Sequence, residues 1–320
     1  MRRALASIAA ATLAFVVAGC GGSSGSEVKT EGGNAQVTVG TIPIVDVAPI
    51  YLGKEKGFFS KRNIDLTLKT AAGGAAIVPS VMSGEYQVGF SNFTSLLLAR
   101  DKGLPLKVVS NGVSSTGVQG KDFGAIVVAG NSPIKTPKDL SGKRVAVNTL
   151  KNIGDTAVRN SIRKDGGDPA TVKLVELPFP DMPPALAGGR VDAAFVVEPQ
   201  LSQTLAAGAR PITSTYVDLA PNLSVAGYFV TEKLLASDKD LVTRFTEAIQ
   251  ESLAYADAHP DEVRQVLTSY TKITPDLIPK LTLPKWPVEV NKESVATLGE
   301  LATSDKLLSK APDLNALYAD

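Results

Sequence analysis

Val37-Thr38-Val39-Gly40-Thr41-Ile42 is a run of mostly β-branched residues that stops at Pro43, a pattern typical of a buried strand. From this strand onward the pattern alternates, and it predicts a helix, a strand, a helix and a strand over residues 48–59, 64–68, 73–82 and 86–90. Strands that alternate with helices of this length form mainly parallel sheets with helices on both faces. The stretch therefore begins an α/β unit.

The same order of elements returns about 105 residues later. Strands and helices are predicted in turn over residues 144–147, 154–164, 172–177, 182–187 and 191–196. The third strands also align, with Ser83–Phe90 opposite Gly188–Phe195, although few of their residues are identical. A chance likeness between two alternating α/β segments is the alternative interpretation. We interpret the repeat as two lobes of the same construction.

The length and the composition agree with two folded lobes. The chain has 320 residues, of which 44% are hydrophobic and 20% are charged, so it has ample material for a core. Its 33 basic and 32 acidic residues give a formal charge of +1, which argues against the broad positive field of a nucleic-acid-binding protein. The single cysteine, Cys20, excludes an internal disulfide, and the single histidine, His259, excludes most zinc sites. We expect neither a metal nor a cofactor.

The N-terminus indicates export. A basic start precedes an apolar run over residues 4–18, which is short for a bilayer-spanning helix and typical of a secretory signal. Its end, Val17-Ala18-Gly19-Cys20, resembles the lipobox of bacterial lipoproteins, in which cleavage before the cysteine leaves a lipid-modified residue. We expect a signal peptide at residues 1–19, lipidation of Cys20, and a flexible tether at residues 20–35 that holds the protein on the extracytoplasmic face of the cell membrane. The alternative is a cysteine that merely follows an ordinary signal peptide.

The last quarter of the chain is expected to be mostly helical, over residues 240–258, 260–268, 275–281 and 294–301. It contains no third α/β unit, so we expect these helices to pack on the first lobe. Lobe 1 would then be discontinuous, and two crossing segments near residues 125–129 and 225–230 would form a hinge. This division assigns residues 36–127 and 226–320 to lobe 1 and residues 128–225 to lobe 2.

Ligands of open parallel sheets bind beyond the carboxyl ends of the strands, where loops and helix N-termini present free N–H groups. If the two lobes face one another, all six strand ends converge on one cleft. Tyr228, on the returning crossing segment, could contact a ligand there or serve only in hinge packing. The other candidate ligand-binding residues are Asp46, Gly73, Gly74, Ala75, Ser91 and Asn92 in the first lobe and Asn148, Thr149, Phe179, Asp181 and Glu198 in the second.

Two features of this set suggest its chemistry. Gly73-Gly74 lets the backbone approach a ligand closely, or simply forms a tight turn. Proline is tolerated in the first turn of a helix, so the position of Pro79 predicts that the helix begins near Ala75 or Ala76. Asp46 and Glu198 could act as an acid/base pair, accept donors from an amine or an aminopyrimidine, or be solvated, whereas Asp181 could cap the next helix. Because no arginine falls at a strand end, an anion would depend on helix N-termini, amides and Lys151. The residues therefore lean weakly toward a nitrogen-bearing ligand.

Four segments carry a resemblance to a known family. Residues 48–59, which read APIYLGKEKGFF, residues 83–85, 132–147 and 187–193 together resemble the solute-binding proteins of ABC importers for nitrate, sulfonates, taurine and thiamine-pyrimidine precursors. The resemblance covers about residues 36–255. It implies a two-lobed type II periplasmic-binding-protein fold that delivers a small molecule to a membrane permease and its ATPase subunit. Two residues depart from the family pattern, Gln87 in place of a usual aspartate and Pro79 in the helix after the glycine pair.

We therefore expect a monomeric binding protein that closes over a small polar solute, such as a sulfonate, nitrate, taurine or a thiamine-pyrimidine precursor, and contacts it from both lobes. The rival is an enzyme, since some proteins that resemble this fold synthesise a thiamine pyrimidine with histidine and cysteine-rich elements. Here Cys20 lies in the lipobox, and His259 lies far in sequence from every strand end. No phosphate-binding G-x-x-x-x-G-K-[ST] loop occurs, so ATP hydrolysis would belong to a partner subunit.

Overall fold

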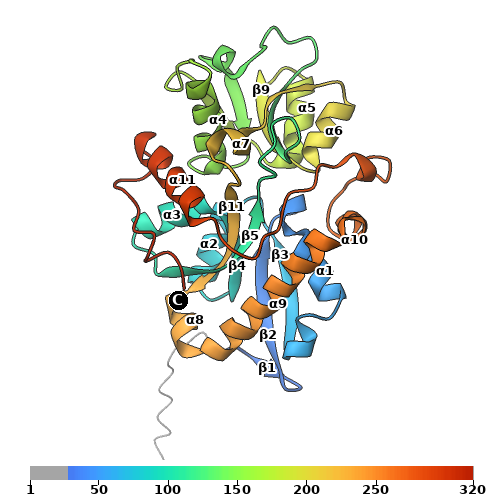
Figure 1. Ribbon diagram of the computed structural model, residues 1–320, viewed down its shortest axis with the longest axis vertical. Helices are drawn as coiled ribbons and strands as arrows, with labels where there is room; N and C mark the ends of the chain where they lie inside the picture. The colour runs from blue at the N-terminus through green and yellow to red at the C-terminus, as the bar shows by residue number, and fades with distance from the viewer. Residues whose placement is uncertain (1–27, 320) are drawn as a thin grey trace, which may run out of the picture.

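Two β-sheets organise the chain, one in each lobe (Figure 1). The computed structural model describes residues 28–319, and the predicted signal peptide and Cys20 lie outside this range. The first sheet has the path β1-β2-β4-β11-β5, with β3 also paired to β2, and the second has the order β10-β6-β9-β7-β8. The strands of the first sheet are β1 (Thr30–Glu31), β2 (Asn34–Thr41), β3 (Ile64–Thr70), β4 (Val88–Asn92), β5 (Leu106–Ser114) and β11 (Ser224–Thr231). Those of the second are β6 (Gly124–Val128), β7 (Arg144–Val147), β8 (Lys173–Glu176), β9 (Ala193–Val197) and β10 (Arg210–Thr213).

The two sheets repeat one pattern, as the sequence predicted. In the first, β3, β2 and β4 are parallel, and β11 lies antiparallel between β4 and β5. In the second, β8, β7 and β9 are parallel, and β6 lies antiparallel between β9 and β10. The central strands β4, β6, β9 and β11 are almost wholly buried, as expected for strands covered on both faces. The predicted two-lobed α/β fold is therefore confirmed, but both sheets are mixed rather than mainly parallel, because β11 and β6 run antiparallel to both of their neighbours.

Helices cover both sheets. The long helix α9 packs against α1 and β5, and α11 packs against α3, so these two helices of the last quarter contact elements of the first lobe. α11 also contacts α4 of the second lobe, and the helix predicted over residues 275–281 is only a 3-10 turn at Ile278–Lys280. The α-helices are α1 (Ala48–Glu55), α2 (Gly74–Met82), α3 (Phe93–Asp101), α4 (Ile153–Lys164), α5 (Met182–Ala187), α6 (Gln200–Ala206), α7 (Thr215–Leu219), α8 (Glu232–Ser237), α9 (Lys239–Ala258), α10 (Pro260–Val266) and α11 (Lys292–Ser304).

Two local predictions were wrong. Helix α2 begins at Gly74, so Pro79 lies beyond its first turn. Pro79 is exposed, and water can therefore pair with the carbonyl that its missing N–H leaves without a donor. The predicted tether is ordered from β1 onward, because Gly32 and Gly33 have φ angles of 59° and 90° and turn the chain into a β1–β2 hairpin.

The connections between the lobes lie beside the segments that the sequence suggested. Residues 125–129 and 225–230 fall mainly in β6 and β11, inside the two sheets. The chain instead passes between the sheets at residues 115–123 and again at residues 220–223. We therefore propose that the lobe boundaries lie in these two connections rather than at residues 127 and 225.

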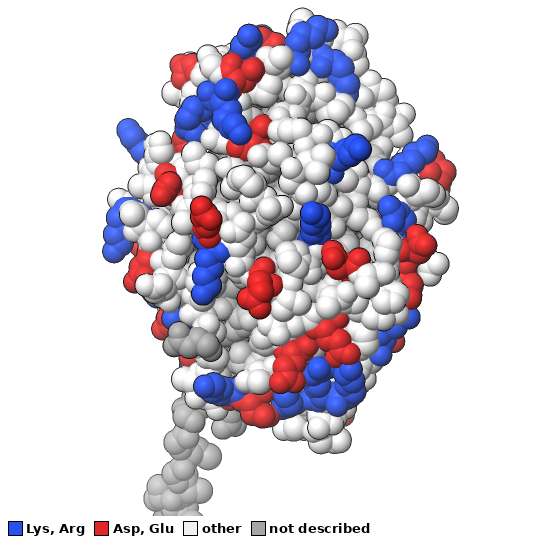
Figure 2. Space-filling view, in the orientation of Figure 1, with Lys and Arg blue, Asp and Glu red and all other residues white. Residues whose placement is uncertain are grey.

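Acidic and basic side chains are intermixed on the face shown in Figure 2, as the balanced composition suggests. One mixed group joins Lys61 and Arg62 to Glu247 and Glu251 of α9. Within residues 28–319, no helix combines the length and the apolar character needed to cross a membrane.

Candidate functional site

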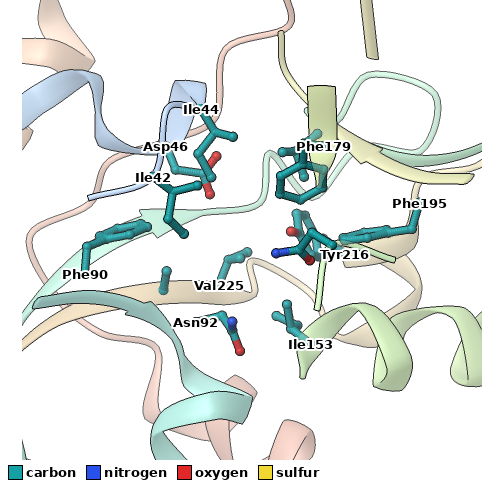
Figure 3. A pocket seen from close by; sticks show the side chains of 13 residues that line it. Ile42, Ile44, Asp46, Phe90, Asn92, Ile153, Phe179, Phe195, Tyr216 and Val225 are labelled. Atoms are coloured by element: carbon teal, nitrogen blue, oxygen red, sulfur yellow. The ribbon is translucent and has the colours of Figure 1, made fainter. Parts of the chain in front are cut away.

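A cavity lies where the carboxyl ends of the parallel strands of the two sheets meet, and both lobes line it (Figure 3). The first lobe contributes the loop after β2 and parts of β4 and β11, and the second contributes β9, α7 and the residues after β7 and β8. The lining residues are Ile42, Ile44, Asp46, Phe90, Asn92, Asn148, Ile153, Phe179, Phe195, Val197, Tyr216, Val225 and Ala226.

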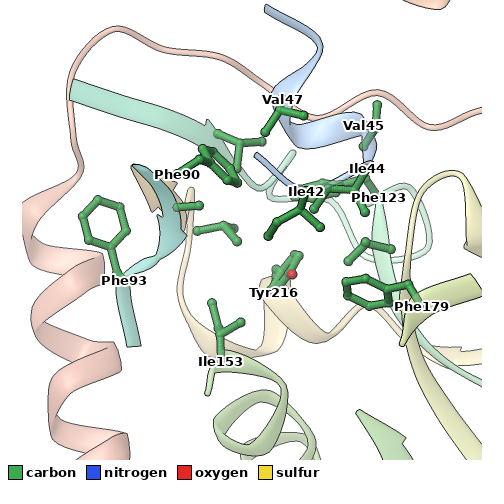
Figure 4. Packing of buried hydrophobic residues seen from close by; sticks show 14 of the residues in the cluster. Ile42, Ile44, Val45, Val47, Phe90, Phe93, Phe123, Ile153, Phe179 and Tyr216 are labelled. Carbon is green, nitrogen blue, oxygen red and sulfur yellow. The ribbon is translucent and has the colours of Figure 1, made fainter. Parts of the chain in front are cut away.

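The walls of the cavity are mostly aromatic and aliphatic. Ile42 and Phe90 of the first lobe face Ile153 and Phe179 of the second, so the packed apolar cluster continues from one lobe into the other (Figure 4). The space open to the centres of water molecules is about 30 Å³, enough for about two waters. A larger solute must therefore displace lining side chains or part the lobes as it enters.

Asp46 supplies the one carboxyl among the lining residues. Its side chain reaches into the cavity from the 3-10 turn Val45–Val47, opposite Phe179 (Figure 3). Burial raises the pKa of this carboxyl to about 7; its own backbone N–H opposes the rise, and the charge of Asp122 adds to it. The Oδ1 atom of Asp46 is buried and has no hydrogen-bond partner in the protein. A buried carboxyl oxygen in this state is suited to pair with a donor on a ligand.

The two asparagines that line the cavity retain donor capacity. The side-chain oxygen of Asn92 accepts the backbone N–H of Ser95 at 2.9 Å and thereby caps α3. The side-chain oxygen of Asn148 accepts from the amide of Asn152 at 3.4 Å. In both residues, therefore, the structure engages the carbonyl oxygen, and the amide N–H₂ group is the part suited to contact an acceptor on a ligand.

The glycine pair brings the two lobes into contact. A Cβ atom placed on Gly73 would lie 2.6 Å from Oγ1 of Thr149 and 3.0 Å from Nδ2 of Asn148, both in the second lobe. A Cβ on Gly74 would lie 2.3 Å from Oγ of Ser91, in its own lobe. Gly73 therefore permits close approach across the cleft, and Gly74 permits close packing of α2 on β4.

Four of the predicted site residues line the cavity, namely Asp46, Asn92, Asn148 and Phe179. Tyr228 lies behind the lining, where its ring contacts Phe90 and Phe245 at centroid distances of 5.3 and 6.1 Å, and its buried hydroxyl has no partner. Asp181 is exposed and makes no side-chain cap to α5, contrary to the expected capping role. The predicted residues outside the lining are Gly73, Gly74, Ala75, Ser91, Thr149, Asp181, Glu198 and Tyr228.

Glu198 serves the protein itself and does not line the cavity. Its carboxylate accepts the backbone N–H and hydroxyl of Ser202 at 3.0 and 2.9 Å, and the backbone N–H of Thr282 at 3.1 Å. Its backbone carbonyl accepts the N–H of Val45 from the first lobe at 3.0 Å. Burial raises the pKa of this carboxyl, while these hydrogen bonds lower it. The paired-carboxylate hypothesis for Asp46 and Glu198 therefore receives no support from the geometry.

Replacing Glu198 by alanine is expected to destabilise the protein without changing direct recognition of a solute. Alanine leaves the N–H and hydroxyl of Ser202 and the N–H of Thr282 without their acceptor, and a buried donor without an acceptor costs about 1–3 kcal/mol. Urea denaturation at pH 8 measures this loss, with the exposed Glu55→Ala as a matched control. A large loss of solute affinity at unchanged stability would instead assign Glu198 to recognition.

Sequence reasoning missed most of the apolar lining. Phe90 and Phe195 lie in strands that the sequence did predict, but their side chains have the pattern of ordinary core residues. Tyr216 comes from α7, which was not predicted, and burial raises the pKa of its hydroxyl well above the usual value, with further contributions from Asp46 and Asp122. Within residues 28–319, no three or more His, Cys, Asp or Glu side chains are placed to hold a metal ion.

Residues 44–263 match the protein family described as NMT1/THI5 like, which is more than half of the chain. The chain belongs to this family. A relative from Haemophilus influenzae whose name assigns it to thiamine biosynthesis is 27% identical over 237 residues, covering 70% of this chain and 69% of that protein. The riboflavin-binding protein RibY of Chloroflexus aurantiacus is 25% identical over 223 residues, covering 69% and 62% of the two chains.

Another relative and a structural neighbour carry names of different functions. The 4-amino-5-hydroxymethyl-2-methylpyrimidine phosphate synthase of Candida albicans is 21% identical over 227 residues, covering 67% of this chain and 64% of that enzyme. The structure of the alkanesulfonate-binding protein SsuA from Xanthomonas axonopodis pv. citri, bound to MOPS, superposes with a TM-score of 0.75 at 18% identity, covering 88% and 98% of the two chains. This likeness identifies the periplasmic-binding-protein fold.

Proposed function

We propose that this protein is the solute-binding subunit of an ABC importer and that it carries a small nitrogen heterocycle, such as a thiamine-pyrimidine precursor. It works on the extracytoplasmic face of the cell membrane, anchored through lipid on Cys20, and passes the solute as a monomer to a permease and its ATPase subunit. The family membership, the two-lobed fold and the cavity lined by both lobes support this role. Closure over a solute is a population shift, which requires contacts to both lobes.

The observation that carries the choice of solute is the free oxygen of Asp46 in an apolar cavity. A buried carboxyl with an unpaired oxygen recovers its lost hydrogen bond when a ligand presents an N–H donor. With a pKa of about 7, the same group can also donate to a ring nitrogen when it is protonated. An aminopyrimidine offers both the donor and the acceptor on neighbouring atoms.

The surroundings of Asp46 favour a flat, uncharged or cationic ring over an anion. None of the described residues that line the cavity is basic, so a sulfonate or nitrate would be buried beside a carboxyl without a compensating charge. Phe90, Phe179, Phe195 and Tyr216 instead present aromatic surface on which a heterocycle can stack. The names of the thiamine-related and riboflavin-binding relatives agree with a heterocyclic solute.

A panel of candidate solutes tests this choice by thermal shift and calorimetry. We expect 4-amino-5-hydroxymethyl-2-methylpyrimidine to raise the unfolding temperature at pH 7.5, because a ligand at about 100 times its Kd adds about 2.7 kcal/mol of stability. Ethanesulfonate, taurine and nitrate at equal concentrations should leave that temperature unchanged. Stabilisation by one of these anions, without effect of the pyrimidine, would refute the choice of solute but leave the transport role open.

The enzymatic alternative rests on the synthase relative from Candida albicans. Among the described residues, His259 is the single histidine, and it lies at the junction of α9 and α10, where its ring stacks on Tyr255 at a centroid distance of 3.8 Å. It is not among the residues that line the cavity. We therefore propose that the solute leaves unaltered, which NMR of the solute recovered after prolonged incubation checks.

A further inference from the structure

A segment near the C-terminus crosses the junction between the lobes. Residues 282–291, here called the C-terminal strap, run without helix between the 3-10 turn Ile278–Lys280 and α11, in front of β5 and β11 in Figure 1. Lys285 exchanges two backbone hydrogen bonds with Ser114 at the end of β5, at 2.8 and 3.0 Å. Asn291 donates its backbone N–H to Oγ of Ser224 at the start of β11, at 2.9 Å. The C-terminal strap is therefore bonded to β5, the last strand before the second lobe, and to β11, the first strand after it.

At the centre of the C-terminal strap lies Trp286, the only tryptophan of the chain. The residue is 2% exposed, and its indole Nε1 donates to the backbone carbonyl of Asp46 at 3.0 Å. Its own backbone N–H donates to Oδ1 of Asp257 in α9 at 3.1 Å. Trp286 thus joins α9 of the first lobe to the residue whose carboxyl reaches into the cavity.

The turn that holds Asp46 is buried and leads directly into α1. It is a 3-10 turn of three residues, Val45–Val47, and no side chain caps its N-terminus. Short 3-10 turns have weak internal hydrogen bonds, so bonds from outside must fix them. Two such bonds come to the turn itself from distant segments, the N–H of Val45 to the carbonyl of Glu198 and the indole N–H of Trp286 to the carbonyl of Asp46. A third holds its N-cap residue, since the hydroxyl of Tyr270 donates to the carbonyl of Ile44 at 3.1 Å.

We propose that Trp286 is a positioning residue for solute binding, which holds the main chain of Asp46 so that its carboxyl faces the cavity. Trp286 does not line the cavity itself. The proposal rests on the proposed function, since it takes Asp46 as the group that meets the solute. It also gives the C-terminal strap a role in binding. The C-terminal strap lies outside residues 36–255, the segment with the family resemblance.

The first test needs no solute. Hydrogen exchange of the backbone amides of residues 44–48 is measured in the wild-type protein and in Trp286→Phe, with the buried central strands β9 and β11 as an internal reference for global unfolding. We expect exchange at the turn to become about tenfold faster, as the loss of one buried hydrogen bond implies. The exposed side chain of Lys285 provides a control from the same segment, since Lys285→Ala should leave this exchange unchanged.

The second test separates positioning from a general packing role. Trp286→Phe should weaken binding of 4-amino-5-hydroxymethyl-2-methylpyrimidine about tenfold when Asp46 is present, and less than about twofold in an Asp46→Asn background. Because the chain has one tryptophan, global replacement by 3-benzothienylalanine removes only this N–H and preserves the ring volume. This second variant should reproduce the tenfold loss even where Trp286→Phe folds poorly.

Three results would overturn the proposal: unchanged exchange at residues 44–48, unchanged affinity despite faster exchange, or an equal loss of affinity in both backgrounds. If the wild-type protein binds no aminopyrimidine, the proposed solute is wrong. The exchange result then decides by itself whether Trp286 holds Asp46.

Discussion

Asp46→Asn is expected to raise the stability of the solute-free protein at pH 8. Asparagine is neutral at every pH and nearly isosteric, so it removes a buried charge without leaving a cavity. Each pKa unit corresponds to about 1.4 kcal/mol, so a carboxyl raised from 3.8 to about 7 destabilises the folded protein at pH 8 by at most about 4 kcal/mol. Denaturant unfolding at pH 8 measures this gain.

The sign of the pH dependence follows from the raised pKa. Between about pH 4 and pH 7 the unfolded carboxyl is ionised while the folded one still holds its proton, so the stability of the wild-type protein falls as the pH rises. The gain from Asp46→Asn should therefore be near zero at pH 4 and complete above pH 7. Asp139 provides a control of opposite sign, since the N–H groups of Lys135 and Thr136 lower its pKa and Asp139→Asn should destabilise at pH 8.

The same Asp46→Asn change should weaken binding of an aminopyrimidine about a hundredfold, because a hydrogen bond to a charged group contributes about 1.5–3 kcal/mol. Greater stability joined to weaker binding is typical of a residue kept for function. Unchanged or lower stability at pH 8 would contradict the burial of this charge. Unchanged affinity would remove Asp46 from recognition.

Gly73→Val is expected to weaken solute binding about a hundredfold while each lobe remains folded. Gly73 has φ −173° and ψ 165°, extended backbone that valine adopts without strain, so the obstacle lies only between the lobes. Even the first added carbon would lie 2.6 Å from Oγ1 of Thr149, and the further methyl groups would hold the lobes apart. A solute that needs contacts from both sides would then lose one set of them.

Calorimetry gives the affinity of this variant, and small-angle scattering gives the separation of its lobes. Ala72→Val is the matched control, because it adds bulk at an exposed neighbour of the same turn. Thr149→Ala should partly restore binding to Gly73→Val by opening space on the facing lobe. Wild-type affinity in Gly73→Val alone would show that the contact between Gly73 and Thr149 has no part in closure.

The fold could be predicted wherever local pattern decided it. Runs such as Val37–Ile42 and Arg144–Val147 contain several β-branched residues, are bounded by turns and are followed by helices, and the structure has a strand at each. The antiparallel placement of β6 and β11 could not be predicted, because each pairs with strands from distant parts of the chain. Because β6 and β11 lie inside the sheets, the chain passes between the sheets at residues 115–123 and 220–223, and not at the predicted residues 125–129 and 225–230.

The site was predictable to the extent that strand ends define it. That rule found Asp46 and Asn148, but a buried phenylalanine such as Phe90 has the same pattern whether it faces a core or a cavity. The hydrogen bond from the N–H of Ser202 to Glu198 could be predicted locally, because an acid just before a helix often accepts from the N–H groups of the first turn. The hydrogen bond from Trp286 to Asp46 could not be predicted from a local pattern, since 240 residues separate the two.

The apolar cluster that continues from one lobe into the other has a thermodynamic consequence. Each opening of the molecule hydrates the facing surfaces of Ile42, Phe90, Ile153 and Phe179, which raises the heat capacity. Hydration of such surface becomes less unfavourable on cooling. The free energy of hydrating this apolar surface therefore helps to set the population of the open state, which is the state that a solute can enter.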